Sequence, residues 1–142
     1  MTIYLDSSAL VKGFIREVGS DSVGELLLRD EPLASSRITY VECLAAIARA
    51  GREGRATEGR EASANQDFQL RWANLVVVEV DEVIAFRAGG LVQDFPLRGA
   101  DAIQLASAQF ISQGAKPVVF ACWDRRLWGA ARELGFEVVP AS

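Results

Sequence analysis

The most informative absence in this 142-residue chain is histidine, which does not occur at all. Without histidine the chain cannot contain a Ser-His-Asp triad, a Cys-His pair, an HExxH zinc motif or a histidine-based nuclease site. Only two cysteines are present, Cys43 and Cys122, too few for a disulfide framework and, without histidine, for a structural zinc site of the usual type. Both lie in apolar stretches, so we expect small buried side chains at these positions.

Long apolar runs are also lacking. None approaches the ~18 residues that a membrane-spanning helix needs, and the chain start reaches Asp6 without the basic flank of a signal peptide. We therefore expect a cytoplasmic protein that makes no membrane contact. Half of the residues are hydrophobic and 24% are charged, which is an ordinary globular composition. The length suits a single domain over residues 1–142.

Basic residues are outnumbered, with 15 Lys and Arg against 19 Asp and Glu and a net charge of −4. This balance argues against passive binding of nucleic acid through a basic surface. It does not argue against an enzyme that holds phosphates through metal ions, because clustered carboxylates then belong to the site. Thirteen of the basic residues are arginine; arginine suits bidentate phosphate contacts, although genome composition would explain the same bias.

Short apolar runs alternate with helical patterns along the chain. We expect helices near residues 8–15, 21–29, 39–50, 81–94, 101–112 and 125–134, further helical spacing through Phe68, Trp72 and Leu75, and strands near 3–5, 32–35, 75–80, 118–121 and 137–139. This alternation predicts an α/β fold with a parallel sheet and helices on both faces.

Three local features refine this prediction. In the helix near 39–50, Val41, Leu44, Ala45 and Ala48 have the spacing of one apolar face. The run 75–80 is typical of a buried strand. Residues 51–62 alternate arginine with glutamate, which fits a solvated loop and helix start or a mobile flap that meets RNA or a partner chain.

Four acids stand where ligands bind in open parallel sheets, outside the carboxyl ends of the strands. Asp6 directly follows the first strand, Asp124 follows another, Asp101 opens a helix, and Glu42 lies among apolar neighbours near a helix start. Taken singly, each Asp is explained as a helix cap. Brought together, the four would repel one another, and no lysine lies beside any of them. A divalent cation with oxygen ligands, Mg²⁺ or Mn²⁺, is the natural counter-charge.

Four segments carry a resemblance to a known family: Ile3–Lys12, Ser36–Glu42, Leu97–Ala106 and Phe120–Leu127. In order and spacing they resemble the PIN-domain ribonucleases, specifically the VapC-type toxins of type II toxin–antitoxin pairs. The resemblance spans nearly the whole chain. It implies a single PIN domain built as a three-layer α/β/α sandwich, with a central, mostly parallel sheet of about five strands.

The resemblance also assigns roles to the acids. Asp6, Glu42, Asp101 and Asp124 match the acidic quartet with which the family holds one or two Mg²⁺ or Mn²⁺ ions for RNA hydrolysis. Asp6 and Asp101 match the most direct ligands, Glu42 and Asp124 complete the site directly or through water, and Ser8 matches a hydroxyl that lines the pocket.

The chain departs from the family pattern at two positions. Gln104 stands where the family often has histidine, so any proton transfer there is absent. Cys122 stands where Thr or Ser often precedes the last acid by two residues, which weakens the hydroxyl support near Asp124.

The reaction implied is metal-assisted hydrolysis, in which water attacks phosphorus in line and leaves a 5′-phosphate and a 3′-hydroxyl. Arg98, Arg125 and Arg126 lie close in sequence to two of the acids. They are candidates for contacts with backbone phosphates, with simple surface solvation as the alternative.

Partners and competing functions follow from the same pattern. The resemblance implies an antitoxin that blocks the site, and we expect a homodimer; Phe14, Trp72 and Trp128 are candidates for either interface or for core packing. A phosphatase of the haloacid dehalogenase type would need D-x-D after the first strand, and Asp6-Ser7-Ser8 does not supply it. A PIN-like binding module that has lost catalysis is the remaining alternative.

Overall fold

The computed structural model describes residues 1–54 and 58–142. Helices and strands alternate along the chain as the sequence predicts. Their order is β1 (Thr2–Leu5), α1 (Ser7–Leu10), the 3-10 turn η1 (Val11–Gly13), α2 (Ser20–Leu27), β2 (Leu33–Ser36), α3 (Arg37–Arg52), α4 (Glu58–Trp72), β3 (Val76–Val78), α5 (Glu82–Asp94), α6 (Gly99–Ser112), β4 (Val118–Ala121), α7 (Arg125–Glu133) and β5 (Glu137–Val139).

The described strands form one sheet in the order β3-β2-β1-β4-β5, and every neighbouring pair is parallel. From β1 the chain first builds outward through β2 to β3, and then returns to the other side of β1 with β4 and β5. The strand order therefore reverses between β1 and β4, and ligands bind at such a switch point in open α/β sheets. The predicted parallel sheet is confirmed.

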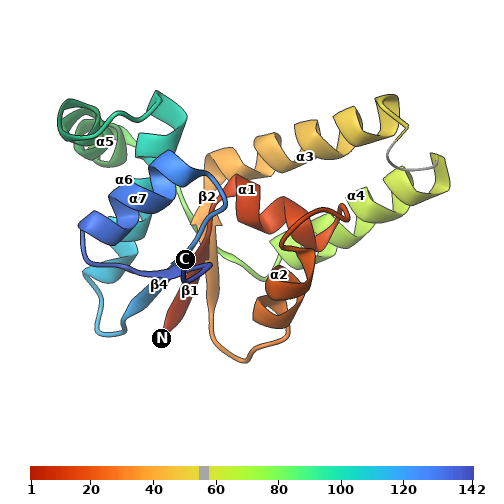
Figure 1. The fold of residues 1–142 in the computed structure, drawn as a ribbon, viewed down its shortest axis with the longest axis horizontal. Helices are drawn as coiled ribbons and strands as arrows, with labels where there is room; N and C mark the ends of the chain where they lie inside the picture. The colour runs from red at the N-terminus through yellow and green to blue at the C-terminus, as the bar shows by residue number, and fades with distance from the viewer. Residues whose placement is uncertain (55–57) are drawn as a thin grey trace.

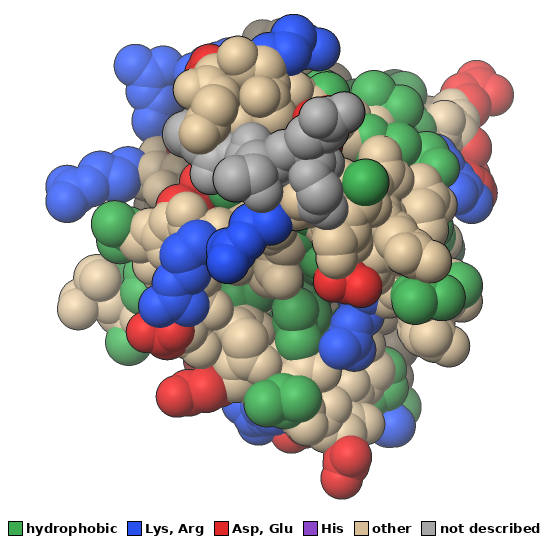
Figure 2. All heavy atoms as spheres, turned by 90° about the vertical axis from the view of Figure 1, so that its right-hand side faces the viewer, with side chains coloured by type: hydrophobic (Ala, Val, Ile, Leu, Met, Phe, Trp, Pro, Cys, Tyr) green, Lys and Arg blue, Asp and Glu red, His purple; other side chains and the backbone are tan. Residues whose placement is uncertain are grey.

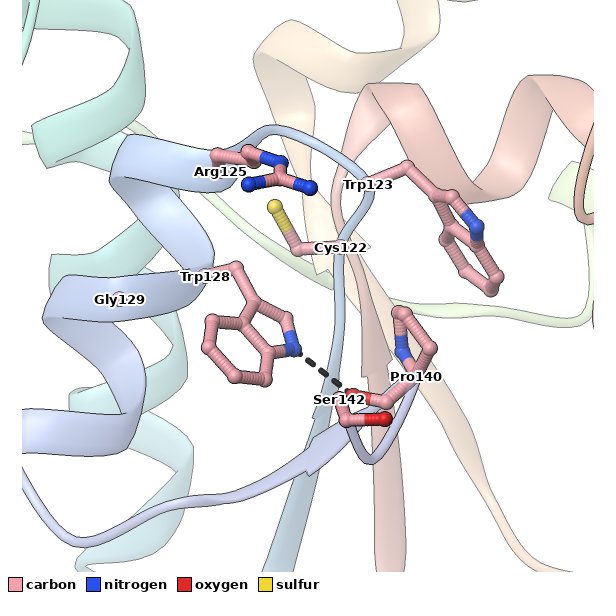
Figure 3. Close-up of a pocket in the computed structure, with 7 residues that line it drawn as sticks. All are labelled: Cys122, Trp123, Arg125, Trp128, Gly129, Pro140 and Ser142. Carbon is pink, nitrogen blue, oxygen red and sulfur yellow. Dashed lines mark hydrogen bonds between the residues drawn. The ribbon is translucent and has the colours of Figure 1, made fainter.

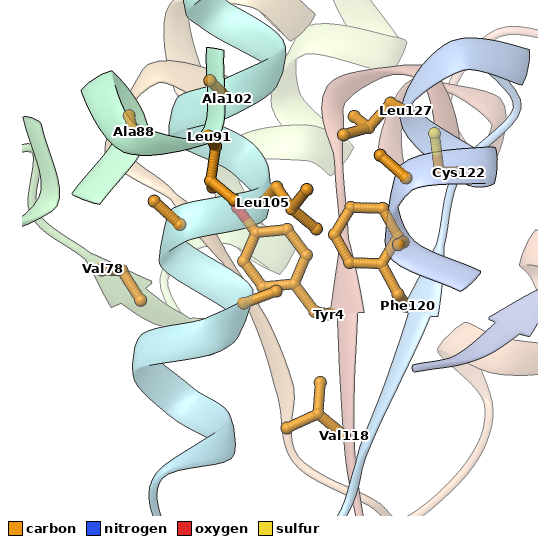
Figure 4. Packing of buried hydrophobic residues seen from close by; sticks show 14 of the residues in the cluster. Tyr4, Val78, Ala88, Leu91, Ala102, Leu105, Val118, Phe120, Cys122 and Leu127 are labelled. Carbon is orange, nitrogen blue, oxygen red and sulfur yellow. The ribbon is translucent and has the colours of Figure 1, made fainter. Parts of the chain in front are cut away.

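Helices cover both faces of the sheet, so the three-layer α/β/α sandwich is also confirmed (Figure 1). Strand side chains alternate between the faces. On one face Tyr4 stacks on Phe120 with ring centroids 5.4 Å apart, within a cluster closed by α5, α6 and α7 (Figure 4). On the other face Ile3 and Leu5 pack with residues of α1 to α4.

Helix caps gather at one edge of the sheet. The side chains of Asp6, Ser36, Asp81 and Asp124 accept hydrogen bonds from the first backbone N–H groups of α1, α3, α5 and α7. Each cap ends or follows a strand, so these helices all begin at the carboxyl edge. At the opposite end of α7, Gly135 has a φ of +91°, the left-handed conformation expected of the glycine that ends a helix.

Two expectations about exposure are wrong. The buried face of α3 consists of Thr39, Cys43, Ile47 and Ala50, whereas Val41 is 65% exposed. The polar Thr39 belongs to the buried face, so a count of apolar residues alone selected the wrong stripe. The strand β3 is likewise an edge strand and not a buried one, because only β2 pairs with it, and Val76 is 52% exposed.

The helices α3 and α4 form a hairpin that projects from the body of the molecule (Figure 1). They extend into the segment 51–62 from both sides, and residues 55–57 lie outside the described part of the chain. Figure 2 looks onto this end, where basic and acidic side chains are interspersed. No described helix combines the length and the hydropathy needed to cross a bilayer.

Candidate active site

The four acids singled out from the sequence lie at the carboxyl edge of the sheet. Asp6 and Asp124 follow β1 and β4, the two strands that flank the switch point. Asp101 lies in the first turn of α6, and Glu42 lies in the second turn of α3. Their charges act on one another: Asp124 raises the pKa of both Asp6 and Asp101, and Glu42 also raises that of Asp101. The fold therefore brings these carboxylates into one electrostatic cluster.

Asp6 is the most deeply placed of the four, with 4% of its surface exposed. Its Oδ1 accepts hydrogen bonds from the Ala9 backbone N–H at 2.9 Å and from the Ser8 hydroxyl at 2.7 Å. Burial raises its pKa from 3.8 to about 6, the charge of Asp124 adds a smaller effect, and the hydrogen bonds oppose both. A buried carboxylate with this pKa lacks a positive partner.

Asp101, in the first turn of α6, lies close enough to Asp124, at the start of α7, for the charge of Asp124 to act on it. Asp124 is held as the α7 cap by the backbone N–H groups of Arg126 and Leu127, at 3.0 and 3.1 Å. Partial burial is the main cause that raises the pKa of Asp101, followed by the charge of Asp124, while the nearby charge of Arg98 lowers it. Of the three candidate arginines, Arg98 is therefore near enough to Asp101 to stabilise its ionised form.

Glu42 is the most exposed of the four, and a buried polar network holds it. The Ser7 hydroxyl and the Gln104 amide both donate to Glu42 Oε1, the latter at 3.3 Å. Gln104 Nε2 also donates to Thr39 Oγ1 at 2.9 Å, and Gln104 Oε1 accepts from the buried Tyr4 hydroxyl. Gln104 therefore connects the core to the acidic edge, a role that its position in the sequence does not predict.

Ser8 and Cys122 join the two strands at the switch point. Besides donating to Asp6, the Ser8 hydroxyl accepts the Trp123 backbone N–H at 2.9 Å. The Cys122 sulfur accepts the Asp124 backbone N–H at 3.3 Å. Both cysteines are buried, as expected, and burial raises the pKa of each thiol. Cys122 thus supports the turn before Asp124 through its sulfur in place of a hydroxyl.

The acids have no basic partner among the ion pairs of the described residues, which join Lys12–Glu17, Arg16–Asp21, Arg29–Glu31 and Arg37–Glu79. No three His, Cys, Asp or Glu side chains in the described part of the chain lie close enough to form a complete metal site. Mg²⁺ does not require one, since it keeps several waters and uses one or two carboxylates together with substrate phosphates. The oxygen-only donors and the uncompensated charge of Asp6 fit such an ion.

The arginines and aromatic candidates divide between surface and core. Arg98 caps the start of α6 through its backbone, and Arg125 and Arg126 open α7; all three are exposed beside the acids. Trp72 is 8% exposed and packs against Phe68 in the core, so its candidacy as an interface residue is wrong. Phe14 and Trp128 are half-buried.

Sequence reasoning missed Ser7 and Thr39. Ser7 is next to Asp6 and Thr39 lies three residues before Glu42, but their contacts depend on Gln104, which lies 97 and 65 positions further along the chain. The sole local signal is the polar residue at position 104, in the middle of an apolar helix. A buried glutamine requires hydrogen-bond partners, and these are found only when α1, α3 and α6 are placed together.

Comparisons with known proteins agree with this geometry. The model of the PIN domain family matches residues 3–120. Ribonuclease VapC49 of Mycobacterium tuberculosis (strain ATCC 25618 / H37Rv) is 40% identical over 139 residues, covering 98% of this chain and 95% of that protein. Ribonuclease VapC46 of the same strain is 36% identical over 140 residues, covering 99% and 98%.

The fold has matches among solved structures as well. A toxin–antitoxin complex from Klebsiella pneumoniae contains a chain that superposes with a TM-score of 0.67 at 17% identity, covering 99% of this chain and 98% of that one. At this identity the match supports the architecture alone. Together with the family model and the two relatives, it confirms the resemblance drawn from the four segments: this chain belongs to the PIN domain family.

Proposed function

We propose that this chain is a metal-dependent endoribonuclease that hydrolyses RNA phosphodiester bonds and acts as the toxin of a toxin–antitoxin pair. One observation carries the proposal: acidic side chains from the end of β1, α3, α6 and the start of α7 influence one another at the switch point, and none of them forms an ion pair among the described residues, in a chain 40% identical to a protein named a ribonuclease. The packing of β5 against both core clusters, through Val138 and Val139, supports one domain over residues 1–142.

The acids have the donor chemistry for Mg²⁺ or Mn²⁺. Asp6 and Asp101 would hold the ion, and Glu42 and Asp124 would complete the site directly or through water. When bound, the ion would supply positive charge that makes water more acidic and offsets the charge that develops on the phosphate. The expected products carry a 5′-phosphate and a 3′-hydroxyl.

The chain's own residues fix these carboxylates before substrate arrives. Ser8 and the Ala9 N–H orient Asp6, and Ser7 with Gln104 orients Glu42. Such preorganisation lowers the cost of reaching a reactive arrangement. The exposed guanidinium groups of Arg98, Arg125 and Arg126 flank the acids and would contact backbone phosphates on either side of the scissile bond.

The inactive binding module is not favoured. A module that no longer cleaves RNA has no need to keep a buried, ionisable Asp6, whose pKa is raised by burial and by the charge of Asp124. Such a group costs stability in the folded state unless a cation or a proton accompanies it.

The proposed partner is a small antitoxin that covers the acidic edge. The solved structure from Klebsiella pneumoniae is itself a toxin–antitoxin complex, and the net charge of −4 suits a partner segment with basic side chains. We place the activity in the cytoplasm, where the RNA substrate is found, and we expect a homodimer. Purification of the native protein without a small partner would count against the antitoxin, and light scattering tests the dimer.

Growth after tightly induced expression tests the proposal. The comparison uses the native chain, Asp101→Asn, which keeps the shape of the side chain and removes one charge, and Asp30→Asn as the matched control. Asp30 is exposed and precedes β2 at the opposite edge of the sheet. We expect arrest by the native chain and by Asp30→Asn, and growth with a soluble, folded Asp101→Asn chain.

Two results would oppose the proposal. Equal arrest by the native chain and Asp101→Asn would show that toxicity does not depend on the acidic cluster. Growth with all three chains, each produced in soluble form, would contradict toxicity in that host.

A further inference from the structure

A cavity of about 560 Å³ lies next to the acidic cluster, between α7 and the ends of β4 and β5. Its walls include Cys122, Trp123, Arg125, Trp128, Pro140 and Ser142 (Figure 3). We call this cavity the Trp128 pocket. Asp124, one of the four acids, stands between the lining residues Trp123 and Arg125 in the chain, so its backbone adjoins the pocket. Its volume is within the range of about 300–1,000 Å³ that small-molecule sites occupy.

The indole of Trp128 forms the main aromatic wall, and the fold holds it in place. Its Nε1 donates to the Pro140 carbonyl oxygen at 2.7 Å, and the Arg132 guanidinium lies 5.4 Å from the centroid of the ring. Figure 3 shows the ring beside the Pro140–Ser142 segment, with Arg125 and Cys122 above it. Because the ring is already fixed, a flat ligand can pack on it at little further entropic cost.

The remaining walls give the pocket its chemical character. Arg125 brings a planar, positively charged group to the pocket wall, and Pro140 adds apolar surface. Trp123 lies on the far side of Pro140, where Lys12 Nζ is 5.4 Å from its ring centroid (Figure 3). Trp128 and Arg125 both belong to α7, so they are the ring and the cation that we assign to one ligand.

We propose that the Trp128 pocket receives one unpaired base of the RNA substrate, next to the phosphodiester bond that is cleaved. The inference rests on the proposed function. Proteins that read single-stranded RNA stack unpaired bases on aromatic rings and on arginine guanidinium planes, the combination found here. A base seated in the pocket would place its own backbone beside Asp124, so the pocket would fix which phosphate faces the acidic cluster.

Gly129 provides a way to block the pocket. It lines the cavity within α7, and a Cβ atom added there would meet no atom within 4 Å. Gly129→Phe should therefore occupy the pocket without disturbing the helix. Gly89→Phe is the matched control, because Gly89 lies at an exposed position of α5 with equally open space.

Binding is measured with the Asp101→Asn chain, which does not consume the probe. The probes are fluorescein-labelled single-stranded RNAs of about ten nucleotides: oligo(A), oligo(C), oligo(U) and a mixed sequence. We expect Gly129→Phe to weaken the binding of the preferred RNA roughly 5- to 150-fold, the range for loss of one stacked base. Gly89→Phe should leave it unchanged. As a second pair, Trp128→Leu should weaken binding, whereas Trp128→Phe should retain most of it.

Three outcomes would overturn the inference. In the first, Gly129→Phe binds every probe within about twofold of Gly89→Phe. In the second, none of the probes binds either chain. In the third, Gly129→Phe no longer binds the antitoxin but keeps its affinity for RNA, which would assign the pocket to the protein partner. RNA cleavage by the native chain and Asp101→Asn tests the proposed function separately, so the two failures are distinguishable.

Discussion

Replacing Asp6 by asparagine should make the metal-free protein more stable while removing its activity. Asp6 is buried at the switch point, and burial raises its pKa from 3.8 to about 6. Asparagine has nearly the same shape, and its side-chain oxygen can still accept the Ala9 N–H as the cap of α1. The substitution therefore removes mainly the charge.

The magnitude follows from the pKa. Folding raises the pKa of Asp6 from 3.8 to about 6. Below pH 3.8 the carboxyl group is protonated in both the folded and the unfolded chain, so it costs no stability. As the pH rises from 3.8 to about 6 the unfolded chain ionises more readily, and the free energy of unfolding falls. The difference between 3.8 and about 6 corresponds to about 3 kcal/mol of destabilisation above pH 7, and to about half of that at pH 5. For a chain of this length, Asp6→Asn should raise Tm on the order of 10 °C at pH 8.

Thermal unfolding in EDTA, at pH 8 and at pH 5, measures this effect. The native chain is compared with Asp6→Asn and with Asp30→Asn, whose side chain is exposed. We expect a clear gain for Asp6→Asn at pH 8, a smaller gain at pH 5, and little change for Asp30→Asn at either pH. A destabilised Asp6→Asn chain, or a gain that does not depend on pH, would refute the electrostatic explanation.

Three further predictions follow from the same site. Adding Mg²⁺ to the metal-free native chain should raise Tm by preferential binding to the folded state, and thermal scans should show no such rise for Asp6→Asn. Gln104→Leu should leave the buried Tyr4 hydroxyl without its acceptor, and urea unfolding should show a loss of stability of about 1–3 kcal/mol. The same substitution should slow RNA cleavage, because Glu42 loses a hydrogen-bond donor. Unchanged stability would contradict the hydrogen-bond network around Gln104. The thiols of Cys43 and Cys122 should react slowly with a thiol reagent at pH 8 and rapidly in urea, because burial raises the pKa of both; fast reaction of the folded chain would contradict their burial.

Much of the fold could be predicted from the sequence, because the local signals agree with the final structure. Asp81 caps α5 and Gly135 ends α7, as their positions in the sequence indicate. The strand β4 also has its predicted bounds, since a short apolar run there is buried on both faces of the sheet.

The remaining features depend on contacts between distant parts of the chain. The buried face of α3 includes Thr39 because the Gln104 amide, 65 positions away, satisfies its hydroxyl. The exposure of Val76 follows from the place of β3 at the sheet edge, which only the strand order determines.

The four acids of the candidate site could be predicted from the sequence, but the hydrogen-bond network that holds them could not. The sequence order places Asp6 and Asp124 after strands, but only the reversal of strand order makes those strands neighbours. The network of Ser7, Thr39 and Gln104 joins three helices and leaves a single local trace, a polar residue within the apolar α6.

The most direct test of the central claim is cleavage of a random-sequence RNA pool by the purified chain with Mg²⁺, followed by chemical identification of the new ends. We expect the native chain and Asp30→Asn to produce 5′-phosphate and 3′-hydroxyl ends, and Asp101→Asn to produce none. Ends that carry a 2′,3′-cyclic phosphate, or undiminished cleavage by Asp101→Asn, would contradict hydrolysis by water at the acidic cluster.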